Sequence, residues 1–283
     1  MESLLRAAAV RVRPPSDAAR DEHGRCSVCG IVTRFRFNSW AVSDEIKQKF
    51  GSVGAADAFV RRETLACDTC GSSLRVRRLA DVLLLHYADR ALSLRDLLDE
   101  PHFRALEIAE INSIGRAHHV LARHPRLRYS EYQGKRRLRP AQRTEDICAL
   151  SYDDASLDIV LTSETLEHVP DYELALAETS RVLRTGGRHV FTVPLLPGGA
   201  TTRRVRRVNG DLVHLAPPEH HGRSSRPLLG RLSPKVPDLL CYTDFGLDIV
   251  DDLRTAGFEP ELHFYSPERW EQDLAIVICA QRM

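Results

Sequence analysis

Short apolar runs alternate with amphipathic stretches over the last two thirds of the chain. Residues 157–162 (LDIVLT) and 189–194 (HVFTVP) are almost continuously apolar, as in strands that are buried on both faces of a sheet. Between them, residues 171–184 carry apolar side chains at helical spacing, and Gly186 and Gly187 end that pattern. Strands are also expected at 103–109, at 127–131, over a short run that ends at Asp146, at 259–265 and at 274–281, with helices at 113–123 and 242–257. The alternation predicts an α/β fold, a Rossmann-like, seven-stranded, mostly parallel sheet with helices on both faces.

The pattern changes along the 283 residues, and these changes divide the chain. Residues 76–100 are apolar at helical spacing. Residues 196–242 lack periodicity and are rich in Gly, Pro, Arg, His and Ser, as in a functional lid or a disordered insert. We therefore expect a flexible N-terminus at 1–22, a cysteine module at 23–75, a helical connector at 76–100, and one α/β domain at 101–283 with the insert at 196–242.

Composition limits the class of protein without identifying it. Hydrophobic residues make up 43% and charged residues 28%, and no apolar run is long enough to cross a bilayer. The net charge of +1 argues against a protein that binds polyanions over its whole surface. Basic clusters at 123–143, which includes Lys135-Arg136-Arg137, and at 203–207 fit either solvated loops or contacts with an anionic substrate, nucleic acid or a membrane surface.

Four of the seven cysteines form two near-identical pairs, Cys26 with Cys29 and Cys67 with Cys70, each followed by glycine. A C-x-x-C turn points both sulfurs at one metal ion, and four thiolates complete a closed tetrahedral Zn²⁺ site. Because no ligand position is left open, this zinc would be structural. A redox pair, four unrelated thiols or an iron site are the alternatives. The odd cysteine count and the lack of a secretory signal pattern favour a cytoplasmic location.

Residues 143–197 carry the most specific signal in the chain. Ser163 and Glu164 end the strand expected at 157–162, and the sequence LEHVP follows before the helix. This order resembles the second half of the core of class I S-adenosylmethionine-dependent methyltransferases, particularly the type 11 group, and the resemblance extends over about 103–283. Residues 24–78 resemble small zinc modules that precede some bacterial methyltransferases. The resemblance implies methyltransferase activity with S-adenosylmethionine as cofactor.

The ends of the expected strands supply the candidate cofactor residues. In an open parallel sheet, ligands bind outside the carboxyl ends of the strands at the point where the strand order reverses. Glu131 ends the strand at 127–131 and can accept hydrogen bonds from both ribose hydroxyls, as in dinucleotide-binding proteins. A solvated glutamate beside a basic stretch is the alternative interpretation.

Further cofactor contacts follow from the resemblance. It places Glu107 and Ala109 in the first motif, although the glycine-rich turn that should follow retains only Gly115. It also implies that Asp146 accepts a hydrogen bond from the adenine amino group, that Ile147 packs on the ring, and that Ser163 and Glu164 line the transfer position.

Histidines supply the candidate catalytic groups, because methyl transfer requires alignment of the reactants and removal of a proton from the acceptor. His168 is one candidate, and its alternative role is to cap the turn before Pro170. His220 and His221 in the insert are the others. Together with His214 and Glu219, these two histidines could instead bind a metal or lie on a plain exposed loop.

By analogy, the expected reaction is O-methylation of a small-molecule, sugar, polysaccharide or natural-product acceptor. The first alternative is an RNA methyltransferase that uses the zinc module and the arginine clusters for binding. The second is a non-catalytic, methyltransferase-like binding protein, since the glycine turn is degenerate. Single aromatics between the cysteine pairs favour a lid over a nucleic-acid platform. A homodimer is left open.

Overall fold

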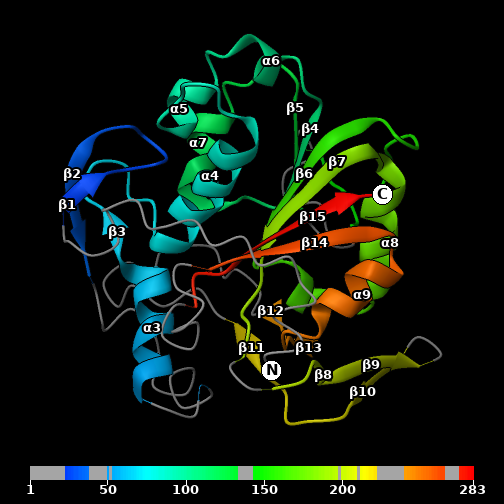
Figure 1. The fold of residues 1–283 in the computed structure, drawn as a ribbon. Coiled ribbons are helices and arrows are strands. Elements are labelled where there is room, and N and C mark those ends of the chain that lie inside the picture. Colours follow the sequence, from blue (N-terminus) through cyan, green and yellow to red (C-terminus); the bar gives the residue numbers. More distant parts are fainter. Residues whose placement is uncertain are drawn as a thin grey trace.

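A computed structural model describes residues 23–37, 50, 53–132, 143–196, 199–208, 211–221, 239–264 and 274–283. In these residues the centre is a six-stranded sheet with the order β14-β15-β7-β6-β4-β5 (Figure 1). The strands are β4 (Ile108–Ile111), β5 (Leu127–Ser130), β6 (Leu157–Ser163), β7 (Leu183–Thr192), β14 (Phe258–His263) and β15 (Val277–Arg282). Strands β5, β4, β6 and β7 are parallel, whereas β15 is antiparallel to β7 and β14. The expected Rossmann-like α/β fold is confirmed, with six strands among the described residues in place of the expected seven.

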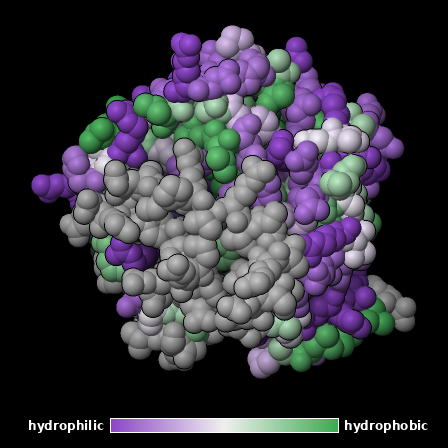
Figure 2. Space-filling model, viewed as in Figure 1, coloured by the Kyte–Doolittle hydropathy of each residue, from purple (hydrophilic) through white to green (hydrophobic). Residues whose placement is uncertain are grey.

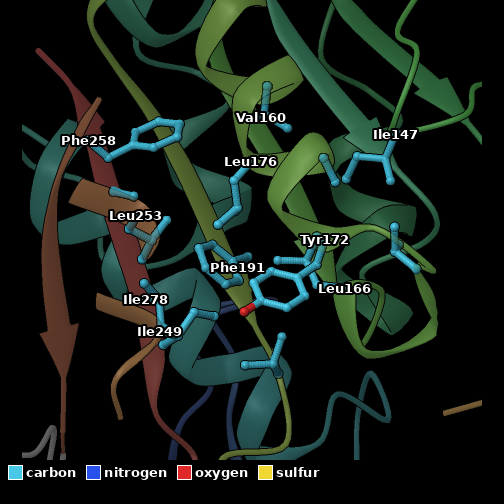
Figure 3. Packing of buried hydrophobic residues seen from close by; sticks show 14 of the residues in the cluster. Ile147, Val160, Leu166, Tyr172, Leu176, Phe191, Ile249, Leu253, Phe258 and Ile278 are labelled. Atoms are coloured by element: carbon cyan, nitrogen blue, oxygen red, sulfur yellow. The ribbon is translucent and has the colours of Figure 1, made fainter. Parts of the chain in front are cut away.

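Helices cover one face of the sheet through α8 (Tyr172–Val182) and α9 (Ile249–Thr255). The side chain of Asp171 caps α8 by accepting a hydrogen bond from the backbone N–H of Leu174. Figure 3 shows Tyr172 of α8 close to Phe191 of β7 in the buried cluster on this face. Residues of α8, α9, β6, β7 and β15 all contribute to that cluster.

The opposite face is covered by α4 (Leu74–Tyr87), α5 (Leu94–Leu97) and α7 (His118–Leu121). The cysteine module consists of β1 (His23–Arg25), β2 (Val32–Arg36), α3 (Val53–Thr64) and β3 (Ala66–Cys67), and it lies beside α4 in Figure 1. Its residues around the paired cysteines and Phe35 belong to the same hydrophobic cluster, whereas the buried residues of α3 pack in a separate small cluster with Leu274. The guanidinium of Arg77 on α4 lies 3.7 Å from the ring centroid of Phe35 on β2. The module, the helical connector and the sheet therefore share one continuous core, although the sequence separates them.

The strand expected to end at Asp146 differs from the observed structure. Residues 143–150 make an isolated bridge between Asp146 and Ala149 and no strand of the sheet. Polar side chains bind the local backbone here. The carboxylate of Glu145 accepts a hydrogen bond from the N–H of Ser151, and that of Asp146 accepts one from the N–H of Cys148. These local hydrogen bonds compete with a sheet ladder and favour a turn.

Several other elements are shorter than the sequence pattern predicts. Phe103 was expected in the first strand but lies in α6 (Pro101–Arg104), because Pro101 can begin a helix and Phe103 fills the core. The helix expected at 113–123 is a 3₁₀ turn (Gly115–Ala117) followed by α7. The helix expected at 242–257 begins at Ile249.

The described part of the 196–242 insert contains short antiparallel pairs. These are β8 (Thr202–Arg203) with β13 (Thr243–Asp244), β9 (Val205–Val208) with β10 (Asp211–His214), and β11 (His220–His221) with β12 (Leu239–Leu240). In the face shown in Figure 2, hydrophilic residues cover most of the coloured surface. Among the described residues, no helix is long and apolar enough to cross a membrane. The expected flexible segment 1–22 and Lys135-Arg136-Arg137 lie outside the described residues.

Candidate functional site at the carboxyl ends of the strands

The carboxyl ends of β5, β4 and β6 lie side by side in the sheet. The chain runs from β4 to β5 on one side and then crosses to β6 on the other, so the strand order reverses between β4 and β6. In open α/β sheets, the crevice outside such a switch point binds the ligand. Glu131 directly follows β5, Ser163 is the last residue of β6, and Glu164 follows it. The structure thus brings three of the expected site residues to one edge.

Glu107 lies at the opposite end of β4. It precedes the strand, and its carboxylate pairs with Arg126 at 3.2 Å and with Arg128 at 3.0 Å. Because a strand rises about 3.3 Å per residue, the four residues of β4 separate Glu107 from the carboxyl end by about 13 Å. Ala109 lies in mid-strand, and its side chain is fully buried in the core. Both side chains therefore lie away from the carboxyl end of β4, and the expected contacts of Glu107 and Ala109 with the cofactor stay predictions that this placement does not support.

Glu110 is the acidic residue of β4 whose side chain reaches the turn, and the sequence interpretation overlooked it. Its side chain is fully buried. The carboxylate accepts hydrogen bonds from the backbone N–H of Ile114 at 2.9 Å and from Nδ1 of His118 at 2.7 Å. The hydrogen bond to Glu110 raises the pKa of His118. A carboxylate therefore organises the turn where the related family has glycines; a charged residue inside the apolar run LEIAEI was the available signal.

Glu131 is held close to β4. Its carboxylate accepts a hydrogen bond from the hydroxyl of Tyr129, and the N–H of the next residue, Tyr132, donates to Oδ1 of Asn112 at 2.9 Å. Asn112 directly follows β4 and has a φ of 59°, a left-handed conformation that asparagine tolerates better than most residues. Both strand ends are thus tied together on the side where a ribose would bind.

Asp146 and Ile147 lie in the turn that replaces the expected third strand. The backbone at Glu131 donates a hydrogen bond to the carbonyl of Arg143 at 3.2 Å, so this turn segment continues alongside the end of β5. Asp146 is exposed, whereas Ile147 is buried in the core cluster. Their proposed contacts with adenine stay predictions.

Two arginines, one within the cysteine module and one at its end, reach the end of β6. The sequence did not predict this contact. Arg62 of α3 is fully buried and donates to Oε2 of Glu164 at 3.1 Å. Arg75, at the start of α4, donates to the hydroxyl of Ser163 and pairs with Glu63 at 2.9 Å. Burial raises the pKa of Glu164, but the charges of Arg62 and Arg75 outweigh this effect and lower it to about 2. Glu164 is therefore an ionised carboxylate held by the module.

The histidines divide into a converging pair and an exposed residue. The rings of His168 and His221 are 4.9 Å apart between centroids, whereas the side chain of His220 is exposed. Nδ1 of His168 contacts the carbonyl oxygen of Leu240 at 3.0 Å, and burial lowers the pKa of His168 to about 4. Nε2 of His221 lies 2.9 Å from Oε1 of Glu219. The fold therefore joins the loop after β6 to the insert.

The four paired cysteines converge as their spacing predicts. Sγ of Cys26 lies 3.7 Å from Sγ of Cys70, Sγ of Cys29 lies 3.9 Å from Sγ of Cys67, and all four sulfurs lie within 4.8 Å of one another. Ligands bound tetrahedrally to zinc at about 2.3 Å would have sulfurs about 3.8 Å apart. The four sulfurs thus fit the coordination shell of one tetrahedral metal ion.

Comparison with known proteins agrees with this arrangement. Residues 115–191 match a family model described as a methyltransferase domain. Residues 115–191 therefore carry a match to a methyltransferase domain, within a sheet that has the strand order and the antiparallel β15 given above.

Similarity to individual proteins is local. The chain is 48% identical over 44 residues to a sarcosine/dimethylglycine N-methyltransferase of Halorhodospira halochloris, which covers 16% of each chain. It is 41% identical over 73 residues to the 27-O-demethylrifamycin SV methyltransferase of Amycolatopsis mediterranei, which covers 24% of this chain and 27% of the relative. The matched regions thus span less than a third of these curated relatives. Among solved structures, a 1,6-didemethyltoxoflavin-N1-methyltransferase of Burkholderia thailandensis is 16% identical over 89% of this chain and 95% of its own, with a TM-score of 0.42.

Proposed function

We propose that the protein transfers the methyl group of S-adenosylmethionine to an oxygen atom of a small-molecule, sugar or natural-product acceptor. One observation carries the proposal. Glu131, Ser163 and Glu164 converge at the carboxyl ends of β5 and β6, on either side of β4 at the switch point of the sheet. The matching of residues 115–191 to a methyltransferase domain, which ends within β7, covers this same edge.

Glu131 is proposed to accept hydrogen bonds from the two ribose hydroxyls. Its carboxylate lies at the end of β5, next to the turn that Glu110 organises. Asp146 and Ile147 are proposed to contact the adenine amino group and ring, because their turn continues past Glu131. When bound, S-adenosylmethionine supplies a methyl group on a positively charged sulfur that leaves on in-line attack. The ionised carboxylate of Glu164 places negative charge near the sulfur position, and Arg75 fixes the orientation of Ser163.

The proton of the acceptor is proposed to leave near His168 and His221. Because a carbonyl oxygen can only accept a hydrogen bond, Nδ1 of His168 carries the proton that it shares with Leu240, and Nε2 is the basic nitrogen. With a pKa of about 4, the ring of His168 is neutral at pH 7 and has this nitrogen available. His220 is proposed to contribute less to proton removal, because its side chain is exposed.

The cysteine module is proposed to hold one structural Zn²⁺ on Cys26, Cys29, Cys67 and Cys70, which its sulfur geometry supports. Arg62 and Glu63 immediately precede the second cysteine pair, and Arg75 follows it. The metal would therefore fix both ends of the segment that contacts Ser163 and Glu164. This supports a module that forms a wall of the transfer site.

An RNA substrate finds less support in the described residues. In the basic run at 203–207, Arg203 pairs with Glu173, and Arg204 pairs with Asp244 at 2.7 Å. Guanidinium groups that are already neutralised contribute little to phosphate binding. Steep loss of RNA binding with rising salt would nevertheless favour that alternative.

Calorimetric titration of the full chain with S-adenosylhomocysteine tests the proposal. One binding site per chain is expected. Lack of binding to both S-adenosylhomocysteine and S-adenosylmethionine would contradict it and would favour a non-catalytic protein.

A further inference from the structure

Glu167 is a buried carboxylate to which methyl transfer assigns no role. Its side chain is 1% exposed, and among the described residues neither carboxylate oxygen has a hydrogen-bond partner. Its backbone carbonyl accepts a hydrogen bond from the N–H of Tyr242, the last residue of the insert, at 2.7 Å. A carboxylate removed from water is unfavourable unless a cation or a hydrogen-bond donor compensates its charge.

Nε2 of His168 lies close to the carboxylate of Glu167. Nδ1 of this ring donates to the carbonyl of Leu240 at 3.0 Å, so Nε2 of the neutral ring presents a lone pair. Nε2 lies 3.7 Å from Oε1 of Glu167, too far for a hydrogen bond. Nε2 of His168 and the carboxylate of Glu167, both able to bind a metal ion, therefore face each other. The hydrogen bond from Nδ1 to the Leu240 carbonyl is of the kind that orients a metal-binding histidine.

His221 of β11 brings a third ligand atom. One atom each from Glu167, His168 and His221 lies within 4.8 Å of the other two. Glu219 contacts Nε2 of His221 at 2.9 Å and so holds its ring. The side chain of His168 is 12% exposed and that of His221 25%, so an ion can enter from the side of the insert.

We propose that Glu167, His168 and His221 form a second metal site, which binds a divalent transition-metal ion such as Zn²⁺. Two imidazoles and one carboxylate suit Zn²⁺ or Fe²⁺ better than Mg²⁺ or Ca²⁺, which prefer ligand sets made of oxygen. Tetrahedral ligands at about 2.0–2.1 Å from a metal are about 3.4 Å apart, close to the observed 3.7 Å between His168 and Glu167. Three protein ligands leave a coordination position open.

The proposed site lies in the loop after β6, where Glu167 is three residues beyond Glu164. An oxygen of the methyl acceptor is the ligand expected at the open position, so the site would favour acceptors with a hydroxyl or phenol group. With the ion bound, Nε2 of His168 would be a ligand, and the ion would take over its part in removing the acceptor proton by lowering the pKa of that hydroxyl. This assignment of the acceptor depends on the proposed methyl transfer, whereas metal binding itself does not.

Metal content of the full chain tests the site. After equilibrium dialysis against Zn²⁺, we expect two zinc ions per chain, of which Cys67→Ser removes the one bound by thiolates. Glu167→Gln and His221→Ala should each leave one ion per chain and weaken zinc binding at the second site at least about 100-fold, more than the loss of an outer partner causes. The matched control is His220→Ala, the exposed neighbour on the same strand, which should retain two ions.

A wild-type chain with one zinc that Cys67→Ser removes would overturn the proposal. Equal losses in His220→Ala and His221→Ala would also overturn it, because they would indicate nonspecific binding by the histidine-rich strand. Should Glu167→Gln fail to fold by circular dichroism, His221→Ala decides, since His221 is partly exposed. S-adenosylhomocysteine binding should be unchanged in His221→Ala, so failure of the metal site and failure of the methyltransferase site are distinguishable.

Discussion

Glu107 and Glu110 are three positions apart, yet they serve opposite ends of the sheet. Glu107 is paired with Arg126 and Arg128, while Glu110 binds the turn at Ile114. The sequence favours Glu107 because it matches a motif. The choice depends on where β4 begins, and that is set by the packing of Phe103 in α6. Residue identity alone therefore predicted an acidic residue in this part of the chain, but it favoured Glu107, which lies three positions before Glu110.

Glu131 and Glu107 give a matched pair of substitutions. Glu131→Ala should weaken S-adenosylhomocysteine binding by about 1.5–3 kcal/mol, roughly 10- to 150-fold, because it removes charge-assisted hydrogen bonds to the ribose. Glu107→Ala should leave that affinity unchanged, since its carboxylate lies at the other end of β4. Isothermal titration calorimetry measures both, and a larger effect of Glu107→Ala would contradict the placement of the site.

At the scale of elements, α3 is coupled to β6 through one buried ion pair. Arg62 is fully buried, and its partner Glu164 follows the strand that defines the switch point. The sequence indicated that Arg62-Glu63 and Arg75 flank the second cysteine pair. It could not show that they reach β6, because a contact between residues about 100 positions apart depends on the tertiary fold.

Arg62→Met should destabilise the protein by about 3 kcal/mol, the low end for breaking a buried ion pair because Arg75 remains near Glu164. Arg61→Ala is the control on the same helix; its side chain is exposed, and a change within about 0.5 kcal/mol is expected. Urea unfolding measures both variants. The double variant Arg62→Met/Glu164→Gln should recover part of the loss, and additive losses would show that the pair is not coupled.

The elements themselves were predicted unevenly. Strand β6 and helix α8 were predicted close to their observed positions, because apolar runs and helical spacing are local signals. Strand β7 begins at Leu183, six residues before the expected start, and it includes the two glycines that were expected to separate helix and strand. The strand expected at Asp146 does not form, since the carboxylates of Glu145 and Asp146 bind the local backbone. The short strand pairs of the insert had no periodic signal, and their partners are up to 42 residues apart.

For the whole molecule, the continuous core makes the cysteine module part of the methyltransferase domain. The core on one face includes Cys26 and Phe35 of the module together with Val190 and Val277 of the sheet. We therefore expect the module and the sheet to unfold together. The spacing of the cysteines predicts the metal ligands of the module. It does not predict this packing, because residues 76–100 were expected only to connect the module to the α/β domain.

Buried histidines make the stability of the whole molecule depend on pH. Burial lowers the pKa of His189 to about 3, well below that of an exposed histidine. Its neutral form is favoured in the folded state, so this contribution is fully present above about pH 6.5 and is lost as the pH falls toward 3. Burial also lowers the pKa of His124 and His168, so these residues likewise make the protein less stable as the pH falls. The pKa of His118 is raised, so its effect on stability is the opposite.

His189→Gln should reduce this acid sensitivity. Between pH 6 and pH 4, the slope of the free energy of unfolding against pH should be smaller in His189→Gln than in the wild type. The difference should be up to about 1.4 kcal/mol per pH unit. Glutamine retains a polar group toward Thr162, which contacts Nε2 of His189 at 3.0 Å. The control is His119→Gln, whose side chain is exposed. Urea unfolding at several pH values measures the slopes, and equal slopes for His189→Gln and the wild type would contradict the prediction.

The most direct test of the central claim is a crystal structure of the full chain with S-adenosylhomocysteine. The account predicts ribose hydroxyls on the carboxylate of Glu131, and the sulfur near Ser163 and Glu164 at the carboxyl end of β6. A cofactor bound at the amino ends of the strands, beside Glu107, would contradict it, as would a sulfur position remote from Glu164.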